Sequence, residues 1–487
     1  RGIPRGSSTK RAKGRAMGIS TDVVVVGGGA SGLSAAFTAR RRGASVVLVE
    51  RRRLGGDCTW TGCVPSKTLI EQARRVHAGR QMGLEGDIDF AAVMERVNER
   101  VLKVSAEEDR PTLEGQGIRV LEGQASFTGP RRLLVDGTPL TGRLIVLATG
   151  STALVPPVPG LRDAEPLTND TVFDLRKLPE RLVVMGGGPI GLELAQAFHR
   201  LGSQVTIVEG LDRVANREEP ETSEVITQVL TGEGVDLVLG SLVEEVNRET
   251  GGSVTLLTAS GASVTGDALL CAVGRRPVTD GLETDRGGVE LDERGFVKVD
   301  GKLRTTAAGV YAAGDICGGP QFTHVGYAMG SLAVENGLGK LPKAFDDRAL
   351  PWVTFTDPEI GRVGLTEAEA FEAHGESAKV AYLPIAETDR AKTSGEGAGF
   401  VKMVAGPHPV LRGLVGGQLL GASVVCPTGG DVVHELALAM HTHTITGRVA
   451  QAVHAYPSWS LAVRECAVQF FTEYKGRSAR NARAANG

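Results

Sequence analysis

The sequence predicts an α/β fold built on parallel sheets, because one pattern occurs twice along the chain. Residues 23–26 and 182–185 are short apolar runs rich in valine, which is typical of strands buried on both faces of a sheet. Each run leads into a glycine-rich turn, a helical segment and a second apolar run. Strands that alternate with helices form parallel sheets. With 487 residues, 41% of them hydrophobic, the chain is long enough for two to four domains.

The first turn has the pattern G-x-G-x-x-G, with Gly27, Gly29 and Gly32 in the glycine positions, and the strand after the helix ends at Glu50. In a Rossmann-like unit the first glycine permits a tight turn and the second lets the backbone approach a pyrophosphate. The third allows the helix to pack closely on the strand. N–H groups at the helix start bind phosphate oxygens, and the later acid accepts hydrogen bonds from a ribose hydroxyl. The segment is therefore a candidate dinucleotide site.

The same pattern returns at Gly186, Gly188 and Gly191, and its second strand ends at Glu209. In both units the acid stands 23 residues after the first glycine. A single motif of this kind is weak evidence, but two complete units predict two dinucleotide sites. Because a carboxylate repels a ribose 2′-phosphate, we expect the second site to favour NAD over NADP. Arg213, four residues after the acid, opposes that preference.

Two of the six cysteines, Cys58 and Cys63, follow the first unit in the stretch G-G-D-C-T-W-T-G-C-V-P-S-K. Pro65 favours the start of a helix, which we expect to continue over residues 68–81. A helix N-terminus lowers the pKa of a thiol and makes a thiolate available as a nucleophile. The pair is therefore a candidate redox centre. The other four cysteines stand in apolar surroundings, where we expect small buried residues.

In this order the motifs resemble the class I pyridine nucleotide–disulfide oxidoreductases, a family that includes dihydrolipoamide dehydrogenase, glutathione reductase and mercuric reductase. The resemblance extends over residues 20–473 and implies FAD at the first glycine unit and NAD(P)H at the second. It implies a redox-active disulfide in which Cys58 exchanges with substrate and Cys63 donates charge to the flavin. Lys67 matches the family's lysine beside the flavin, and Glu193 matches its carboxylate partner.

The resemblance also implies further nucleotide contacts. Ala125, in G-Q-A, matches a short strand that contacts FAD, and Gly150 ends the family's A-T-G turn. Asp315, in Y-A-A-G-D, matches the aspartate that hydrogen-bonds the ribityl and phosphate region of the flavin. Gly274, in G-R-R-P, matches the return from the nicotinamide domain and is assigned to NAD(P).

The architecture that the resemblance implies has two Rossmann-like domains, one for FAD and one for NAD(P), and a C-terminal α+β dimerisation domain. The expected parts are a basic tail or transit-peptide remnant (1–20), an FAD-binding domain in two segments (21–165 and 285–348), an NAD(P)-binding domain (166–284), a dimerisation domain (349–474) and a basic tail (475–487). The resemblance also implies a homodimer whose active site is shared across the interface.

The chain departs from the disulfide reductases near its C-terminus. Where they carry a catalytic His and, five residues later, a Glu, this chain has Tyr456 and Leu461. A tyrosine with a pKa near 10 is a poor base at neutral pH, although it can donate a proton. His454, two residues earlier, is a weaker candidate for the missing base. A tyrosine here resembles mercuric reductase, but residues 477–483 lack the vicinal cysteines through which that enzyme delivers metal.

We therefore expect an NAD(P)H-dependent flavoenzyme that is mercuric reductase-like. Its electrons pass to the disulfide or to a small acceptor such as a quinone, a metal ion or a disulfide substrate. A dihydrolipoamide dehydrogenase is the alternative enzyme, and the missing His and Glu weigh against it. A flavin-bearing structural or regulatory subunit is the alternative of another class. The complete set of Cys58, Cys63, Lys67 and Glu193 weighs against that one.

Charge is unevenly distributed along the chain. Of the 54 Lys and Arg residues, ten lie in two segments without acids, 1–20 and 475–487, leaving 44 against 57 acidic residues. Such a body does not favour DNA or an anionic membrane, so no nucleic-acid partner is expected. The basic N-terminal segment predicts an organellar location, chloroplast or mitochondrion, if it is a transit-peptide remnant, and a cytoplasmic one otherwise.

Neither a membrane span nor a metal site is expected. The uncharged apolar run 23–39 is interrupted by three consecutive glycines, Gly27 to Gly29, and is too short to cross a bilayer. His434, His441 and His443 lie close in sequence, but no carboxylate pattern accompanies them, and we expect them at the surface or at the dimer interface.

Overall fold

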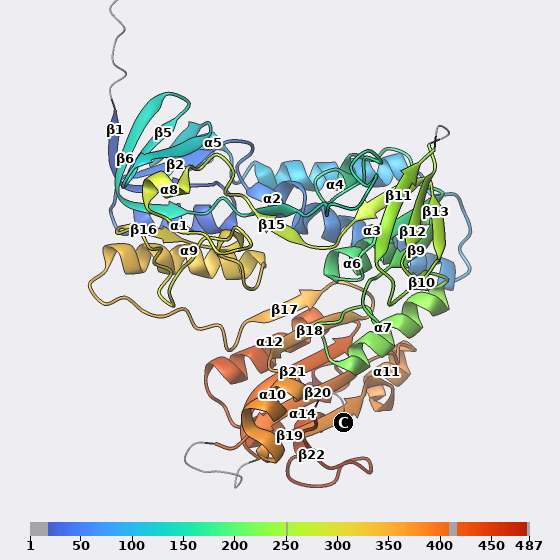
Figure 1. Cartoon of the computed structure of the whole chain (residues 1–487). Coiled ribbons are helices and arrows are strands. Elements are labelled where there is room, and N and C mark those ends of the chain that lie inside the picture. Colours follow the sequence, from blue (N-terminus) through green and yellow to red (C-terminus); the bar gives the residue numbers. More distant parts are fainter. Residues whose placement is uncertain (1–17, 250–251, 409–415, 485–487) are drawn as a thin grey trace, which may run out of the picture. The chain divides into compact units, whose positions relative to one another are not determined.

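The computed structural model describes residues 18–249, 252–408 and 416–484 and forms two compact units (Figure 1). The first unit comprises Arg1–Gly56, Glu108–Ser151 and Pro277–Phe345. The second unit comprises Asp57–Glu107, Thr152–Arg276 and Asp346–Gly487. Most of the expected basic tail at 1–20 lies outside the described residues, so the transit-peptide interpretation stays a prediction.

The first unit is built around a seven-stranded sheet in the order β3-β2-β1-β6-β5-β4, with β16 added beside β6. Strands β1, β2, β3, β6 and β16 are parallel, and β4 to β6 form an antiparallel meander. The elements are β1 (Ile19–Val26), α1 (Ala30–Arg41), β2 (Val46–Glu50), α5 (Arg110–Gly115), β3 (Ile118–Glu122), β4 (Ala125–Gly129), β5 (Arg132–Val135), β6 (Thr138–Leu147), α8 (Thr284–Gly287), β16 (Val310–Ala312), η2 (Asp315–Cys317) and α9 (Thr323–Leu338).

Helices α1 and α9 lie side by side in this unit (Figure 1). Glycines allow the close approach, because a Cβ at Gly330 would lie 2.0 Å from the carbonyl oxygen of Ser31. A Cβ at Gly314 or Gly326 would meet the Ser31 hydroxyl at 2.1 or 2.5 Å. The small residues that follow the glycine turn in α1 are thus explained by the packing of a second helix against them.

The nicotinamide-type segment is the part of the second unit that contains the second glycine turn, Thr152–Arg276. It contains a parallel sheet in the order β10-β9-β8-β14 and an antiparallel sheet in the order β11-β12-β13. Its elements are η1 (Val172–Asp174), β8 (Arg181–Met185), α6 (Pro189–Leu201), β9 (Gln204–Val208), α7 (Pro220–Glu233), β10 (Asp236–Val238), β11 (Val243–Arg248), β12 (Val254–Thr258), β13 (Ser263–Gly266) and β14 (Ala268–Cys271). A pair of short strands, β7 (Ser151–Ala153) and β15 (Arg275–Pro277), is formed where the chain passes between the units.

Three helices stand between β2 and α5 in the chain, and their residues belong to the second unit except for Gly56, the first residue of α2. They are α2 (Gly56–Trp60), α3 (Cys63–Gln81) and α4 (Phe90–Ser105). Helices α3, α4 and α6 share one hydrophobic core, to which α3 contributes Leu69 and Ala73. In this core the ring centroids of Phe90, on α4, and Phe198, on α6, are 5.9 Å apart. Chain order alone does not reveal this arrangement, and the domain boundaries expected from the sequence stay predictions.

The C-terminal part of the second unit is a six-stranded antiparallel sheet in the order β17-β18-β21-β20-β19-β22. Its elements are β17 (Pro351–Thr354), β18 (Glu359–Gly364), α10 (Glu367–His374), η3 (Gly375–Ser377), β19 (Lys379–Pro384), η4 (Ile385–Glu387), α11 (Asp389–Ser394), β20 (Phe400–Gly406), β21 (Gln418–Cys426), α12 (Gly429–His441), α13 (Thr446–Gln451), α14 (Leu461–Val468) and β22 (Arg480–Asn481). Helix α12 packs on β17, β18 and β21, and α14 packs on β19 and β20. The α/β class with a C-terminal α+β domain is therefore confirmed.

The segment expected as a C-terminal basic tail is ordered over its described residues. Two of its residues form β22, which pairs with β19. The Arg477 guanidinium lies 2.7 Å from a Glu387 carboxylate oxygen, and Arg480 is paired with Glu367. The positive charges of Arg477 and Arg480 are thus paired with carboxylates within the fold. Within the ranges described, no helix has both the length and the apolar character needed to cross a membrane.

Candidate active site

The first glycine turn, in the first unit, has a backbone that only glycine can provide. Gly27 has φ +108°, and a Cβ on it would lie 2.2 Å from the carbonyl oxygen of Ala148. A Cβ at Gly32 would lie 1.8 Å from the carbonyl oxygen of Gly27. Gly29 is the N-cap of α1. Gly55 and Gly56 pack on the turn, and a Cβ added at Gly56 would lie only 2.6 Å from the Gly29 Cα. This cradle fits a pyrophosphate at the helix start.

Glu50 is fixed at the end of β2 beside that turn. Its Oε2 accepts a hydrogen bond from the Gly28 N–H at 2.7 Å, and its Oε1 accepts one from the Arg52 N–H at 2.7 Å. A carboxylate held by two N–H groups keeps lone pairs for ribose hydroxyls. The geometry therefore fits the adenosine part of FAD.

Other residues expected at the flavin site lie in the same unit. Ser151 donates to the Asp315 carboxylate at 2.6 Å, directly after Gly150, which has φ +71°. Asp315 begins η2 after β16, which pairs with β6. Ala125 is buried at the start of β4, at the far edge of the sheet. Asp315 and Gly150 are thus brought together, and Ala125 lies on the edge strand β4 of the same sheet.

The second glycine turn repeats the first. Gly186 has φ +114°, and a Cβ on it would lie 2.6 Å from the carbonyl oxygen of Ala272. A Cβ at Gly191 would lie 2.0 Å from the carbonyl oxygen of Gly186, whereas one at Gly188 would meet nothing within 4 Å. The open side at Gly188, the N-cap of α6, is where a pyrophosphate can approach the backbone. The turn fits a second dinucleotide.

Glu209 is held in the manner of Glu50. It accepts hydrogen bonds from the Gly187 N–H at 2.6 Å and the Leu211 N–H at 2.9 Å. The guanidinium of Arg213 donates to the Ser223 hydroxyl at 3.1 Å and to the Asn216 carbonyl at 2.8 Å. Arg213 is thus engaged with its own loop, and the preference for NAD over NADP stays a prediction.

The two cysteines of the redox motif lie on separate helices of the second unit. Cys58 is in α2, and Cys63 is the first residue of α3, so α3 begins two residues before Pro65 and not at it. The structure thereby corrects the expected helix start. Both cysteines are half-buried. Cys63 stands at the positive end of a 19-residue helix, which favours a thiolate there.

Asp57, the residue before Cys58, is tied to the nicotinamide-type segment. It forms an ion pair with Arg275, which follows Gly274 in the G-R-R-P motif. The Asn169 amide lies 3.4 Å from the Asp57 carboxylate and 3.4 Å from the Thr61 carbonyl. These contacts fix the start of the redox segment against strand β15.

Lys67 and Glu193, 126 residues apart in sequence, form an ion pair with 2.8 Å between Nζ and Oε2. Glu193 is only 6% exposed, and its other oxygen accepts a hydrogen bond from the Phe355 N–H at 2.8 Å. The Lys67 ammonium also lies 4.6 Å from the centroid of the Phe355 ring. One turn of α3 and one of α6 therefore hold a fixed pair of opposite charges in the unit that carries Cys58 and Cys63.

Tyr456 and His454 have different partners. The exposed Tyr456 hydroxyl donates to Asp389 at 3.0 Å, and this hydrogen bond raises the pKa of the phenol above its ordinary value. The buried His454 ring contacts the Glu435 carboxylate at 2.9 Å and the Ala452 carbonyl at 3.1 Å. Both ring nitrogens of His454 are thus occupied by its own domain. Leu461 opens α14.

Of the four remaining cysteines, Cys271, Cys426 and Cys466 are buried as expected, whereas Cys317 is only partly buried. Burial raises the pKa of the thiols of Cys271, Cys317, Cys426 and Cys466, to about 12 for Cys317 and Cys426. His434, His441 and His443 are exposed. Across the described ranges, no group of three or more His, Cys, Asp or Glu side chains is arranged to hold a metal ion.

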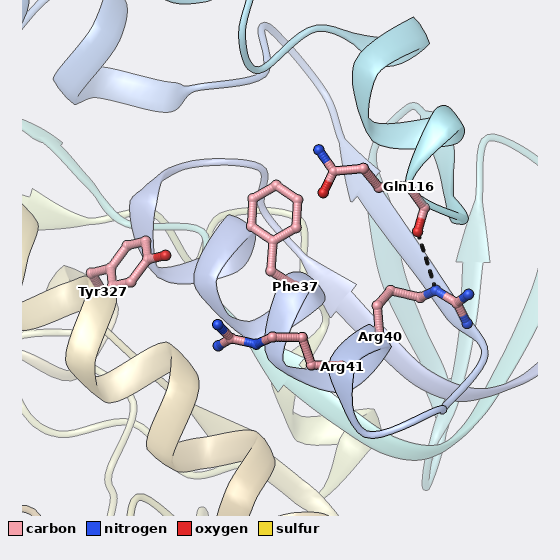
Figure 2. Close-up of a pocket in the computed structure, with 5 residues that line it drawn as sticks. All are labelled: Phe37, Arg40, Arg41, Gln116 and Tyr327. Carbon is pink, nitrogen blue, oxygen red and sulfur yellow. Dashed lines mark hydrogen bonds between the residues drawn. The ribbon is translucent and has the colours of Figure 1, made fainter.

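A hollow of about 440 Å³ in the first unit is separate from these motifs. It is lined by Phe37, Arg40, Arg41, Gln116 and Tyr327. Figure 2 shows Arg40 and Arg41 pointing to opposite sides of Phe37, and the Arg40 guanidinium is hydrogen-bonded to the carbonyls of Ala44 and Gln116. A ligand site needs polar groups that converge, and these do not.

The sequence did not indicate three residues that complete these contacts. Phe355, Asp389 and Glu435 lie 162, 67 and 19 residues from their partners. Each looks like an ordinary core or surface residue in its own segment. For Asp389, the preceding Thr388, which caps α11, predicts a helix start but not a tyrosine partner.

Two dinucleotide turns and a cysteine pair at helix starts define an FAD- and nicotinamide-dependent redox enzyme. Residues 21–330 match the model of the pyridine nucleotide-disulphide oxidoreductases, and residues 350–467 match the dimerisation domain of the same family. The chain belongs to this family. It is an NAD(P)H-dependent flavoprotein disulfide oxidoreductase, and the second match supports a homodimer.

Relatives with two different names are similar over almost the whole chain. Mercuric reductase of Streptomyces lividans is 37% identical over 465 residues, covering 93% of this chain and 96% of the relative. Mercuric reductase of Bacillus cereus is 33% identical over 443 residues, covering 89% and 69%. Dihydrolipoyl dehydrogenase of Thermus scotoductus is 34% identical over 458 residues, covering 92% and 96%.

A solved structure has the same fold. The HOCl-induced flavoprotein disulfide reductase RclA of Escherichia coli gives a TM-score of 0.82 at 30% identity and covers 92% of this chain and 99% of its own. The family and its cofactors are therefore confirmed, whereas the electron acceptor is not determined by these likenesses.

Proposed function

We propose that this chain is a mercuric reductase-like NAD(P)H oxidoreductase that passes electrons through a Cys58–Cys63 disulfide, or past it, to a small acceptor such as a quinone, a metal ion or a disulfide. One observation carries the proposal. The Lys67–Glu193 pair is in place at 2.8 Å, while Tyr456 and Leu461 occupy the positions that carry His and Glu in disulfide reductases.

On the reducing side, the second glycine turn binds NAD(P)H, with Glu209 accepting hydrogen bonds from the ribose. The first glycine turn and Glu50 would hold FAD, which would supply the chemistry that links hydride donation by the nicotinamide to reduction of the disulfide. Glu193 is held by the Phe355 N–H and keeps the Lys67 ammonium in one place, so a fixed positive charge is available without reorganisation. Reduction of one disulfide to two thiols uses the hydride and one further proton.

On the acceptor side, the proton supply limits disulfide substrates. Asp389 holds the pKa of Tyr456 above its ordinary value, so the phenol is protonated at neutral pH and serves as a donor rather than a base. His454 is engaged with Glu435 and does not replace the missing His. The match to a dimerisation domain supports a homodimer, and in that homodimer we propose that Tyr456 lies opposite Cys58 of the partner subunit. Acceptors that need no base are therefore the better substrates.

The proposal is tested by an acceptor panel at fixed NADH: a quinone, ferricyanide, Hg(II), lipoamide and glutathione disulfide. We expect quinone and ferricyanide turnover to exceed disulfide turnover. The double variant Tyr456→His with Leu461→Glu should raise disulfide turnover by roughly 10²-fold, since an acid/base group typically contributes 10²–10⁴-fold. Ferricyanide turnover should change less than about twofold. Tyr456→Phe is the matched control, because it removes the hydroxyl without adding a base.

Efficient lipoamide reduction by the wild type would instead favour a dihydrolipoyl dehydrogenase, the name of several relatives. Binding of FAD without turnover of any acceptor would favour a structural or regulatory subunit. The organellar location stays a proposal that rests on the composition of residues 1–20, and imaging the complete protein in its cell tests it.

A further inference from the structure

Residues 210–219 form the loop that connects β9 to α7. It follows directly after Glu209, the acid assigned to the ribose, and ends beside the C-terminal sheet. Near its middle, the Ala215 N–H donates to the carbonyl of Gly187 at 2.9 Å. A Cβ at Gly187 would lie 3.0 Å from the Val214 side chain. Gly187 in turn donates to Glu209 at 2.6 Å. The loop therefore packs on the residues that form the second dinucleotide site.

The far end of this loop is held by a buried lysine of the dimerisation domain. Lys402, on β20, is 2% exposed. Its Nζ lies 3.0 Å from Glu219, 2.8 Å from Glu221 and 2.8 Å from Glu367. The Glu367 N–H donates to the second oxygen of Glu219 at 2.8 Å. Glu219, at the last loop position, is thus fixed through both carboxylate oxygens.

Two further side chains of the same domain hold the preceding residues. Arg362, on β18, donates to the Arg217 carbonyl and lies 3.7 Å from a Glu218 oxygen. Trp352, on β17, donates to the other Glu218 oxygen at 2.8 Å, and the Arg362 guanidinium lies 4.5 Å from the Trp352 ring centroid. Three consecutive loop residues, 217–219, are therefore held by directional contacts from β17, β18 and β20.

We propose that Lys402 and Arg362 are positioning residues for NAD(P)H binding: by fixing residues 217–219, they keep the loop packed on Gly187 and Glu209 in the geometry that binds the adenosine ribose. Charge-assisted hydrogen bonds are directional, whereas apolar packing of equal volume is more stabilising but less specific in orientation. The inference rests on the nicotinamide nucleotide being bound at the second glycine turn, and it is independent of the electron acceptor.

A second buried ion cluster serves as an internal control. Arg200, on α6, is 5% exposed on its side chain and pairs with Glu233 at 2.5 Å and with Asp357 at 2.7 Å. It joins the nicotinamide-type segment to the C-terminal part of the unit, as Lys402 does. None of its described contacts is to residues 210–219. Loss of either cluster should lower stability, but only the Lys402 cluster should affect the nucleotide.

The experiment uses the FAD-loaded protein and measures the Kd of NAD⁺ by calorimetry, together with the KM of NADH and kcat. Lys402→Met should raise the Kd and the KM roughly 2- to 30-fold, the range typical of residues that act at a distance. At saturating NADH, kcat should change less than about twofold. Lys402→Arg should restore most of the affinity. Flavin reduction by dithionite, which does not use the nucleotide site, should be unaltered.

Arg200→Met should lower Tm but leave the Kd of NAD⁺ unchanged. Equal Kd values for Lys402→Met and wild type, or an equal rise in Arg200→Met, would overturn the inference. If Lys402→Met fails to fold, Trp352→Phe removes only the donor to Glu218, and it should raise the Kd measurably. A folded Trp352→Phe with wild-type affinity would overturn the inference as well. Absence of NAD⁺ binding in the wild type would contradict the nucleotide assignment itself.

Discussion

The two glycine turns have nearly the same local structure but different surroundings. Gly27 and Gly186 have φ +108° and +114°. Glu50 and Glu209 each accept one hydrogen bond from the N–H of the residue after that glycine and one from the N–H two residues after the acid. The helices that follow differ. Helix α1 packs on α9 within the first unit, whereas α6 carries a carboxylate that pairs with Lys67. The two turns thus have the same local structure for binding a dinucleotide, whereas of the two helices only α6 carries a carboxylate that holds Lys67.

Equivalent positions of the two helices make the contrast specific. Ser34 and Glu193 each lie two residues after the third glycine, and both are buried. Ser34 donates to the Tyr327 carbonyl at 2.6 Å, which joins two helices, whereas Glu193 holds the Lys67 ammonium. Seven positions further, Arg41 is exposed and Arg200 is buried between Glu233 and Asp357. At both positions the second helix therefore has a buried charge in an ion pair, where the first has a buried hydroxyl or an exposed arginine.

The largest effects should come from alanine at the third glycine of each turn. A Cβ would lie 1.8 Å from the Gly27 carbonyl oxygen in Gly32→Ala and 2.0 Å from the Gly186 carbonyl oxygen in Gly191→Ala. The backbone must move, so affinity for the local dinucleotide should fall roughly 10- to 100-fold. Gly32→Ala should lose its yellow FAD on purification. Gly191→Ala should keep FAD, reducible by dithionite but poorly by NADH. If Gly191→Ala lost the visible flavin absorbance and Gly32→Ala kept it, FAD would be bound at the second turn and the nicotinamide nucleotide at the first.

The next largest effect should distinguish α6 from α1. Glu193→Gln removes the charge opposite Lys67 and should slow flavin reduction by NADH roughly 10- to 100-fold in stopped-flow absorbance, because a preorganised charge pair is lost. Ser34→Ala removes one hydrogen bond and should cost about 1 kcal/mol of stability. It should leave the reduction rate unchanged. If Ser34→Ala slowed reduction as much as Glu193→Gln, the contrast between a chemical and a structural helix would be wrong.

The turns were predictable from sequence because their backbone requires glycine at fixed spacing, and the acid follows at a fixed distance. The Lys67–Glu193 pair was predictable only through the resemblance, since no local pattern joins residues 126 apart. The Lys402 cluster was not predictable, because its carboxylates come from α10 and the start of α7 and look like surface acids in sequence. The partner of Tyr456 was missed for the same reason.

Low pH should lower the stability of the second unit by protonating Glu367. Burial alone would raise the pKa of this carboxyl, but hydrogen bonds from Arg480 and Lys402 outweigh it and lower the pKa to about 2 from an ordinary 4.5. Because its pKa is lowered in the folded state, the Glu367 carboxylate adds roughly 2–3 kcal/mol to the free energy of unfolding above about pH 4.5. This contribution is lost as the pH falls toward about 2. Burial raises the pKa of the nearby Glu218, which offsets part of this loss.

The measurement is the free energy of unfolding against pH, for wild type and Glu367→Gln. The variant should be less stable at neutral pH and should lose less stability between pH 4.5 and 2, because the titrating group is absent. Equal slopes in that interval would show that Glu367 is not the group concerned. Glu376→Gln, at an exposed carboxylate in η3, is a matched control and should leave the slope as in the wild type.

The smallest expected effect concerns the acids that end the second strand of each unit. Glu209→Ala removes the charge that repels a 2′-phosphate, so the ratio of NADPH to NADH Kd values should fall roughly 3- to 10-fold, mainly through tighter NADPH binding. Glu50→Ala should weaken FAD binding and leave that ratio unchanged, because it belongs to the other turn. For Glu209→Ala, the same change is expected in the ratio of the NADP⁺ to NAD⁺ Kd values, which are measured by calorimetry. A wild type that already prefers NADP⁺ would mean that Arg213 leaves its contacts with Ser223 and Asn216 to bind the phosphate, and Arg213→Gln should then abolish the preference.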